Sequence, residues 1–261
     1  MLKVPCQKCI NCRIARTAEW STRLLHEMHY YPDDQCYFIT LTYDEDHFPP
    51  FGSLSKRHLL NFVQTLKRHT NSPNLKYFMT GEYGDETFRP HYHLILLGLD
   101  VDTTDITDVI NSCWKKGLID VGTVTAESIQ YTCGYVQKKY SGEKALEEYG
   151  EYIEPPFQLQ SNGIGKKWLV ENKNKPSVLT DGIKIHGKPR SFPRYYKKLL
   201  EKDGSDFKYY LQKKAFDAKK EYYEKLDQVL IDNPSFSAYN SDVQRDLTTK
   251  KATELFKKNK I

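Results

Sequence analysis

The stretch Phe88-Arg89-Pro90-His91-Tyr92-His93-Leu94-Ile95-Leu96-Leu97-Gly98 decides how the chain folds. Side chains of a β-strand alternate between its two faces, so His91 and His93 project from the same face and can reach one metal ion. Apolar residues follow on both faces, which is typical of a central strand covered on each side. With 8 histidines in the chain, a His-x-His pair also arises by chance, so a metal site needs independent support.

The preceding strand supplies that support through a carboxylate. Residues 76–83 form an alternating run, and a hairpin turn through residues 84–87 places Glu82 beside His91. Two histidines and one carboxylate, with no residue evident to close the coordination shell, are typical of an open, catalytic metal site. Imidazole ligands favour manganese or zinc over magnesium, but magnesium is the more available ion, so Mg²⁺ and Mn²⁺ both stay open.

The elements around the histidine strand give the fold class. Hydrophobic periodicity and turn residues predict strands and helices in the order β, α, β, β, α, β. In that order they span residues 35–43, 55–68, 76–83, 88–98, 105–115 and 118–124. This is the order of ferredoxin-like, split-βαβ folds, in which helices pack on one side of an antiparallel sheet, so we expect an α+β protein.

The rest of the chain is predicted to be less regular. Residues 1–196 are expected to form one domain in which residues 142–187 are mostly loop, and residues 197–261 a charged helical extension with helices at about 208–230 and 242–259. The extension holds 15 Lys and Arg against 11 Asp and Glu, an excess of four that accounts for most of the formal net charge of +5. This excess favours an acidic partner only weakly.

Composition bounds the class of protein. With 39% hydrophobic and 13% aromatic residues, the 261-residue chain is expected to build a sizeable core. Its longest apolar stretches fall far short of the roughly 18 residues that span a bilayer, and residues 1–5 lack the apolar core of a signal peptide. We therefore expect a cytoplasmic protein with no membrane partner.

Three cysteines, Cys6, Cys9 and Cys12, open the sequence at regular spacing. In a cytosolic chain, cysteines point to metal binding or free thiols rather than disulfides. Thiolates at this spacing suggest a structural Zn²⁺ site, but such a site needs a fourth ligand, which the sequence does not identify. Zinc binding therefore stays open.

The helix predicted after these cysteines, up to about His29, carries a basic face formed by Arg13, Arg16, Trp20 and Arg23. This face is either a solvated surface or one that contacts phosphates, with the tryptophan stacking on a base.

A second informative stretch, residues 126–140, carries Tyr131, Tyr135 and Lys138. Read as a helix, it places these three side chains on one face. Such tyrosine pairs also arise by chance among 19 tyrosines, and Gly134 inside the helix costs about 1 kcal/mol of helix propensity. If the helix packs beside the histidine strand, a tyrosine near a metal ion suits phosphodiester transesterification, since the cation offsets phosphate charge. Lys138 or the metal helps the phenol to attack.

These motifs together resemble those of the HUH endonucleases, the initiators of rolling-circle replication. More narrowly, the chain resembles the replication initiation proteins of microviruses, particularly gokushoviruses, over about residues 4–200. The resemblance rests on Phe38-Ile39-Thr40-Leu41-Thr42-Tyr43, Gly81-Glu82-Tyr83-Gly84, Arg89-Pro90-His91-Tyr92-His93, Tyr131-x-x-x-Tyr135-x-x-Lys138, Pro5-Cys6-x-x-Cys9-x-x-Cys12-Arg13 with Trp20, Gly163-Ile164-Gly165 and Pro193-Arg194-Tyr195-Tyr196. One departure is Tyr92, which stands between the histidines where the family has a bulky hydrophobic residue.

The resemblance implies an activity and a role for each site residue. It implies nicking and rejoining of single-stranded DNA at a replication origin through a 5′-phosphotyrosyl intermediate. The partners implied are a helicase and the replication machinery of the bacterial host, in whose cytoplasm the protein is expected to act. The implied metal ligands are His91, His93 and Glu82, and the implied catalytic residues are Tyr135 as the preferred first nucleophile, Tyr131 as the second and Lys138 as their assistant.

Two other classes of function stay open at this stage. A metal-dependent phosphodiester hydrolase shares the metal site but needs no tyrosine nucleophile. A non-catalytic single-stranded DNA-binding protein uses Tyr37, Tyr43 and Phe78 as stacking platforms on the sheet. The sequence does not identify the origin, the oligomeric state or the role of the C-terminal extension.

Overall fold

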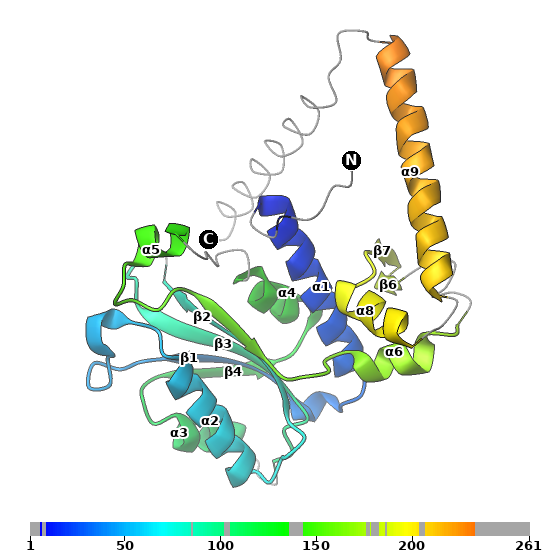
Figure 1. The fold of residues 1–261 in the computed structure, drawn as a ribbon. Helices are drawn as coiled ribbons and strands as arrows, with labels where there is room; N and C mark the ends of the chain where they lie inside the picture. The colour runs from blue at the N-terminus through cyan, green and yellow to red at the C-terminus, as the bar shows by residue number, and fades with distance from the viewer. Residues whose placement is uncertain are drawn as a thin grey trace. The chain divides into compact units, whose positions relative to one another are not determined.

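A five-stranded antiparallel sheet is the centre of the computed structural model (Figure 1). The structure describes residues 6, 9–84, 86–101, 105–135, 143–175, 178, 183–185, 187–203 and 207–232. The strands of this sheet are β1 (Cys36–Thr42), β2 (Lys76–Tyr83), β3 (Pro90–Leu97), β4 (Ile119–Thr123) and β5 (Phe157–Gln160). Their order is β4-β1-β3-β2-β5, so the histidine strand β3 is central, and the first four strands have the predicted split-βαβ topology.

Helices connect and cover these strands. They are α1 (Ile10–Met28), α2 (Lys56–His69), α3 (Ile106–Trp114), α4 (Ala126–Gly134), α5 (Glu143–Tyr149), α6 (Lys166–Asn172), α8 (Arg194–Lys202) and α9 (Phe207–Asp232). Two short 3₁₀ turns, η1 (Asp33–Gln35) and η2 (Pro50–Gly52), and a small hairpin of β6 (Ile183–Ile185) and β7 (Lys188–Arg190) complete the described elements.

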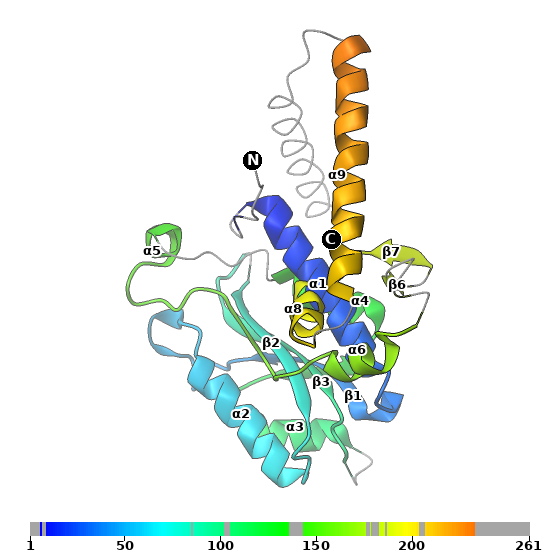
Figure 2. The same cartoon turned by 45° about the vertical axis from the view of Figure 1, so that its right-hand side comes forward.

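Both faces of the sheet are covered, which corrects the expectation of helices on one side only. Leu94 and Leu96 of β3 pack into a core beneath α2 and α3, whereas Ile95 and Leu97 pack on the opposite face against α1 and α4. The views in Figure 1 and Figure 2 agree on this three-layer arrangement. The physical reason is the one given by the strand itself, because apolar residues at consecutive positions need cover on both faces.

The local predictions for the first half of the chain are confirmed in their main features. Ser55 caps α2, since its side chain accepts a hydrogen bond from the backbone N–H of His58 at 3.2 Å. The hairpin between β2 and β3 pairs Glu82 directly with His91. Residues 142–187, in contrast, are not mostly loop, because they contain α5, β5 and α6, and β5 extends the sheet beside β2.

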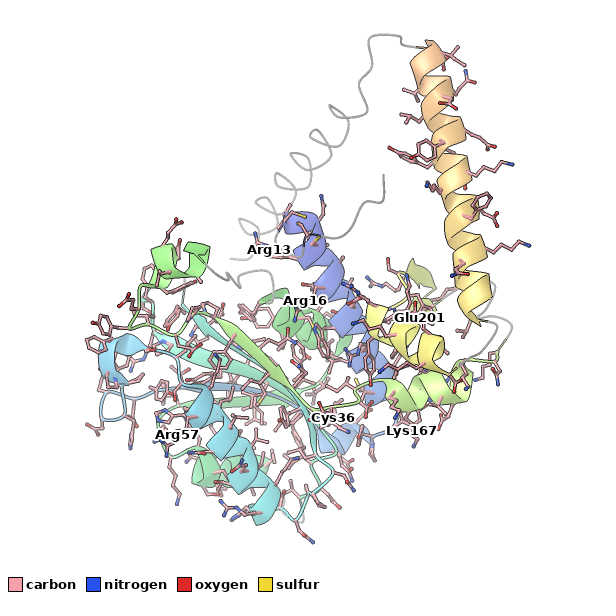
Figure 3. The ribbon with its side chains drawn as sticks, in the orientation of Figure 1. Arg13, Arg16, Cys36, Arg57, Lys167 and Glu201 are labelled. Atoms are coloured by element: carbon pink, nitrogen blue, oxygen red, sulfur yellow. The ribbon has the colours of Figure 1, made fainter. Side chains whose placement is uncertain are left out.

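The basic face predicted on α1 is only partly exposed. Trp20 is buried and packs on Phe78 of the sheet, with 5.2 Å between ring centroids. Arg23 is also buried: its guanidinium lies 4.0 Å from the centroid of the Trp20 ring, and its Nε donates to the carbonyl of Ile164 at 3.1 Å. Arg16 is exposed (Figure 3). Trp20 and Arg23 therefore stabilise the fold and are not placed to contact DNA.

The chain divides into two compact units. Residues 16–172 form one unit, which contains the sheet, and residues 1–15 with 173–261 form the other. In the second unit, α9 confirms the predicted charged helix near residue 208, whereas the helix predicted at 242–259 lies outside the described residues. No helix within the described ranges is long and apolar enough to cross a membrane.

Candidate functional site

The metal-binding group predicted from the sequence is assembled at the end of the β2–β3 hairpin. One carboxylate oxygen of Glu82 lies 3.0 Å from Nε2 of His91 and 3.4 Å from Nε2 of His93. Donor atoms of the three residues all lie within 4.8 Å of one another. Glu82 and His93 are buried, whereas His91 is partly exposed, so the group is open on one side.

The other ring nitrogen of each histidine has a partner that orients the ring. Nδ1 of His91 lies 3.0 Å from the carbonyl oxygen of Arg89, and a carbonyl can only accept, so His91 carries a proton at Nδ1. Nδ1 of His93 lies 3.2 Å from the hydroxyl of Thr40. Metal-binding histidines usually have such second partners, which leave Nε2 free to donate its lone pair. The donor set and its orientation therefore fit a divalent cation.

Tyr92, between the two histidines, points into the opposite core. Its hydroxyl lies 2.8 Å from the hydroxyl of Tyr43 and accepts the backbone N–H of Ser55 at 2.7 Å. Because its polar end is satisfied, this fully buried tyrosine fills the place of the hydrophobic residue expected there.

A polar row crosses the sheet at the level of His93. Residues opposite one another on paired strands share a face, and the register gives the row Asp120, Thr40, His93, Thr80 and Gln158. Thr80 is buried, and neither its hydroxyl nor the side-chain oxygen of Gln158 has a hydrogen-bond partner within the described part of the chain. The sequence reasoning missed these residues, although Thr40 and Thr80 stand where an apolar strand would otherwise place a hydrophobic side chain on the histidine face.

Both predicted tyrosines lie against His93. The ring of Tyr135 stacks on that of His93 with 4.7 Å between centroids and 4° between planes. The ring of Tyr131 meets the same imidazole edge to face at 5.3 Å, and the two phenol rings lie 5.0 Å apart. Tyr131 is 38% exposed, so the tyrosine pair is accessible at its outer side.

Helix α4 is held over the sheet by its first turns. Thr125 and Ser128 form a capping box at its N-terminus, and Ile129 and Cys133 are fully buried against the sheet. The carbonyl of Cys133 accepts the hydroxyl of Thr17 on α1 at 3.2 Å. The helix ends at Gly134, so Tyr135 caps it. Lys138, the predicted assistant of the tyrosines, lies outside the described residues.

The surroundings of Tyr135 disfavour its ionised form. Burial raises the pKa of Tyr135 above its ordinary value, and the Glu82 carboxylate and the neighbouring Tyr131 raise it further. The phenol is therefore neutral near pH 7 and loses its proton only when positive charge is brought near it.

The cysteines of the opening segment also come together. The sulfurs of Cys6 and Cys12 lie 3.9 Å apart, and all three sulfurs lie within 4.8 Å of one another. The backbone N–H of Cys12 lowers the pKa of the Cys9 thiol, but burial and the two neighbouring thiols outweigh this effect and leave that pKa above its ordinary value. All six cysteines of the chain are unbridged.

The chain is similar to replication proteins of phages. The family described as Replication-associated protein ORF2 matches residues 36–140, which include the metal-binding group and both tyrosines. Replication-associated protein ORF2 of Spiroplasma virus 4 is 29% identical, over 94% of this chain and 82% of that protein. Replication-associated protein VP4 of Bdellovibrio phage phiMH2K is also 29% identical, over 76% of this chain and 68% of that protein.

A third relative is more extended than this chain. Replication-associated protein ORF4 of Chlamydia phage 1 is 27% identical over 91% of this chain, which covers 61% of the phage protein. No solved structure matches the chain.

Proposed function

The chain belongs to the replication-associated proteins of phages, and from this premise we propose that it initiates replication by nicking and rejoining single-stranded DNA through a tyrosine. The observation that carries the proposal is the stacking of Tyr135 on His93 at 4.7 Å, which puts a nucleophile beside a metal-binding group. We place this activity at the replication origin, in the cytoplasm of the bacterial host and together with its helicase and replication machinery.

The proposed cation is Mg²⁺ or Mn²⁺, held by Glu82, His91 and His93. A mixed set of imidazole and carboxylate donors is compatible with both ions and favours manganese. When bound, the divalent cation supplies positive charge that polarises the scissile phosphate and lowers the cost of its developing negative charge.

The residues of the chain then perform a transesterification. The hydroxyl oxygen of Tyr135 forms a bond to phosphorus while the bond from phosphorus to the 3′ oxygen breaks. The proton that the phenol releases balances the proton that the 3′ hydroxyl gains. The product is a 5′-phosphotyrosyl linkage, which keeps the bond available for rejoining by the reverse reaction.

The second tyrosine gives the site a second attack. Tyr131 faces the same imidazole as Tyr135 but is more exposed. One tyrosine can therefore hold the first DNA end while the other cuts again. Lys138 remains the proposed assistant.

The test is a denaturing gel of the purified full chain with Mn²⁺ and single-stranded DNA from its own replicon. We expect a slow, nuclease-sensitive protein band in the wild type that is absent in EDTA and in a Tyr131→Phe, Tyr135→Phe double variant, which keeps both rings. Tyr152→Phe, at a 75% exposed tyrosine, is the matched control and should retain the band. Cleavage without a protein–DNA band, persisting in the double variant, would instead identify a metal-dependent hydrolase.

The structure counts against the residues expected for a non-catalytic binder. Tyr43 and Phe78 are 0% exposed, and Tyr37 is partly buried in the same core as Tyr43. Bases cannot stack on buried rings, so this sheet offers no such platform through Tyr43 or Phe78.

Thr80 provides a finer test of the site. A buried hydroxyl without a protein partner usually serves a water, ion or ligand. In Thr80→Val the free energy of unfolding should be unchanged or higher by up to about 1 kcal/mol, because an unpaired polar group is removed. DNA nicking should slow by about tenfold, the effect of losing one hydrogen bond of about 1.4 kcal/mol.

Two measurements check this expectation, urea unfolding and single-turnover nicking. Thr42→Val changes a threonine on the same face, paired with His91 instead of His93, and serves as the control. Unchanged nicking in Thr80→Val would show that this hydroxyl serves no group in the reaction.

A further inference from the structure

The geometry points to a second metal site, separate from the histidine site, in which Cys6, Cys9 and Cys12 bind one zinc ion. Two thiolates on a single tetrahedral zinc lie about 3.8 Å apart, given Zn–S bonds of about 2.3 Å. The sulfurs of Cys6 and Cys12 are 3.9 Å apart, and Cys9 lies within 4.8 Å of both. The side chains therefore already have the spacing that one ion requires.

The same distances argue against the other centres that this cysteine spacing can serve. In an iron–sulfur cluster each thiolate binds a different iron, so the cysteine sulfurs are held apart by the width of the cluster. A sulfur separation of 3.9 Å is too short for that arrangement and much too long for a disulfide of about 2.05 Å.

The backbone around the cysteines favours thiolates. The N–H of Cys9 donates to the sulfur of Cys6 at 3.3 Å. The carbonyl of Cys9 accepts the N–H of Arg13 at 3.1 Å, so Cys9 stands at the N-cap of α1 and Cys12 in its first turn. The N-terminal end of a 19-residue helix carries partial positive charge that stabilises anions there. Arg13, at this end of α1 (Figure 3), adds a positive charge next to Cys12 in the sequence.

The coordination shell has three protein ligands among the described residues. No fourth His, Cys, Asp or Glu in the described ranges joins the group. We therefore assign a site of three thiolates whose fourth position is filled from solvent or by a further group. In either case zinc fixes the segment that precedes α1 to the first turn of that helix.

The test measures metal in the purified full chain, prepared under reducing conditions. The His91→Ala, His93→Ala double variant should retain about one zinc ion per chain by mass spectrometry, because its histidine site is lost and the cysteines remain. Replacing zinc with Co²⁺ should give the near-ultraviolet absorbance of thiolate-to-cobalt charge transfer. Cys6→Ser, Cys9→Ser, Cys12→Ser should lose both signals.

A single substitution guards against loss of the signal through misfolding. Cys6 is exposed and precedes α1, so Cys6→Ser should leave the circular dichroism spectrum unchanged. We expect it to weaken zinc binding at least about 100-fold, because loss of outer-shell partners alone costs 10- to 100-fold. Cys113→Ala, at a buried cysteine outside the group, is the matched control.

Zinc content and cobalt absorbance that persist in the triple serine variant would overturn the assignment. So would iron with inorganic sulfide in the wild type, or a disulfide that persists under reducing conditions. None of these outcomes depends on DNA cleavage, so the zinc site and the nicking activity succeed or fail separately.

Discussion

Tyr135→Phe lowers the rate of the first DNA cleavage at least about 1000-fold, the size of effect expected when an enzyme loses its nucleophile. The substitution removes the attacking oxygen and keeps the ring that stacks on His93 at 4.7 Å. Tyr131→Phe should leave the first cleavage within about tenfold of the wild type and impair the second, since its ring meets His93 edge to face and is more exposed.

The measurement is a quenched time course of the covalent protein–DNA band, followed by peptide mapping of the labelled tyrosine. The double variant sets the background rate. Mapping to Tyr131 in the wild type, with full activity in Tyr135→Phe, would reverse the assigned order of the two tyrosines. Equal losses in both single variants would mean that neither tyrosine alone performs the first cleavage.

His93→Ala should have the second large effect, because it removes a metal ligand and the surface on which Tyr135 stacks. We expect Mn²⁺ affinity to fall at least about 100-fold, more than the loss of an outer-shell partner costs. Nicking at a fixed Mn²⁺ concentration should fall by about 1000-fold or more, since the charge stabilisation of the phosphate is lost with the ion.

Isothermal titration with Mn²⁺ and the nicking assay check this expectation together. Thermal unfolding adds a third readout, because an ion at 100 times its Kd stabilises the wild type by about 2.7 kcal/mol. His47→Ala is the matched control: His47 is exposed and pairs with Asp44 on the surface. If His93→Ala binds Mn²⁺ as tightly as the wild type, Glu82, His91 and His93 do not form the metal site.

The sequence predicted the metal-binding group because its logic is local. Strand alternation and one hairpin turn suffice to bring Glu82 to His91 and His93, and the pairing of β2 with β3 follows that register. The split-βαβ topology was accessible for a similar reason, since the first six elements occur in its order and carry clear periodicity.

Features that depend on distant segments were not accessible. β5 is four residues long and pairs with β2 from about 80 positions away, so no local pattern identifies it. Trp20 and Arg23 have the spacing of a basic surface, but the approach of Ile164 and Phe78 buries them. The stacking of Tyr135 on His93 depends on how α4 packs, which spacing along the helix does not determine.

Strand β3 is hydrogen-bonded on both sides, to β1 and to β2, along its whole length. Its backbone amides therefore exchange with solvent only when the sheet itself opens, whereas the end of the nine-residue helix α4 can open by local unfolding. Hydrogen exchange should separate the two by orders of magnitude in rate. The chain thus divides the reaction between a permanent part, which keeps the cation site assembled, and a yielding part, which can carry a captured DNA end away and return for the next strand.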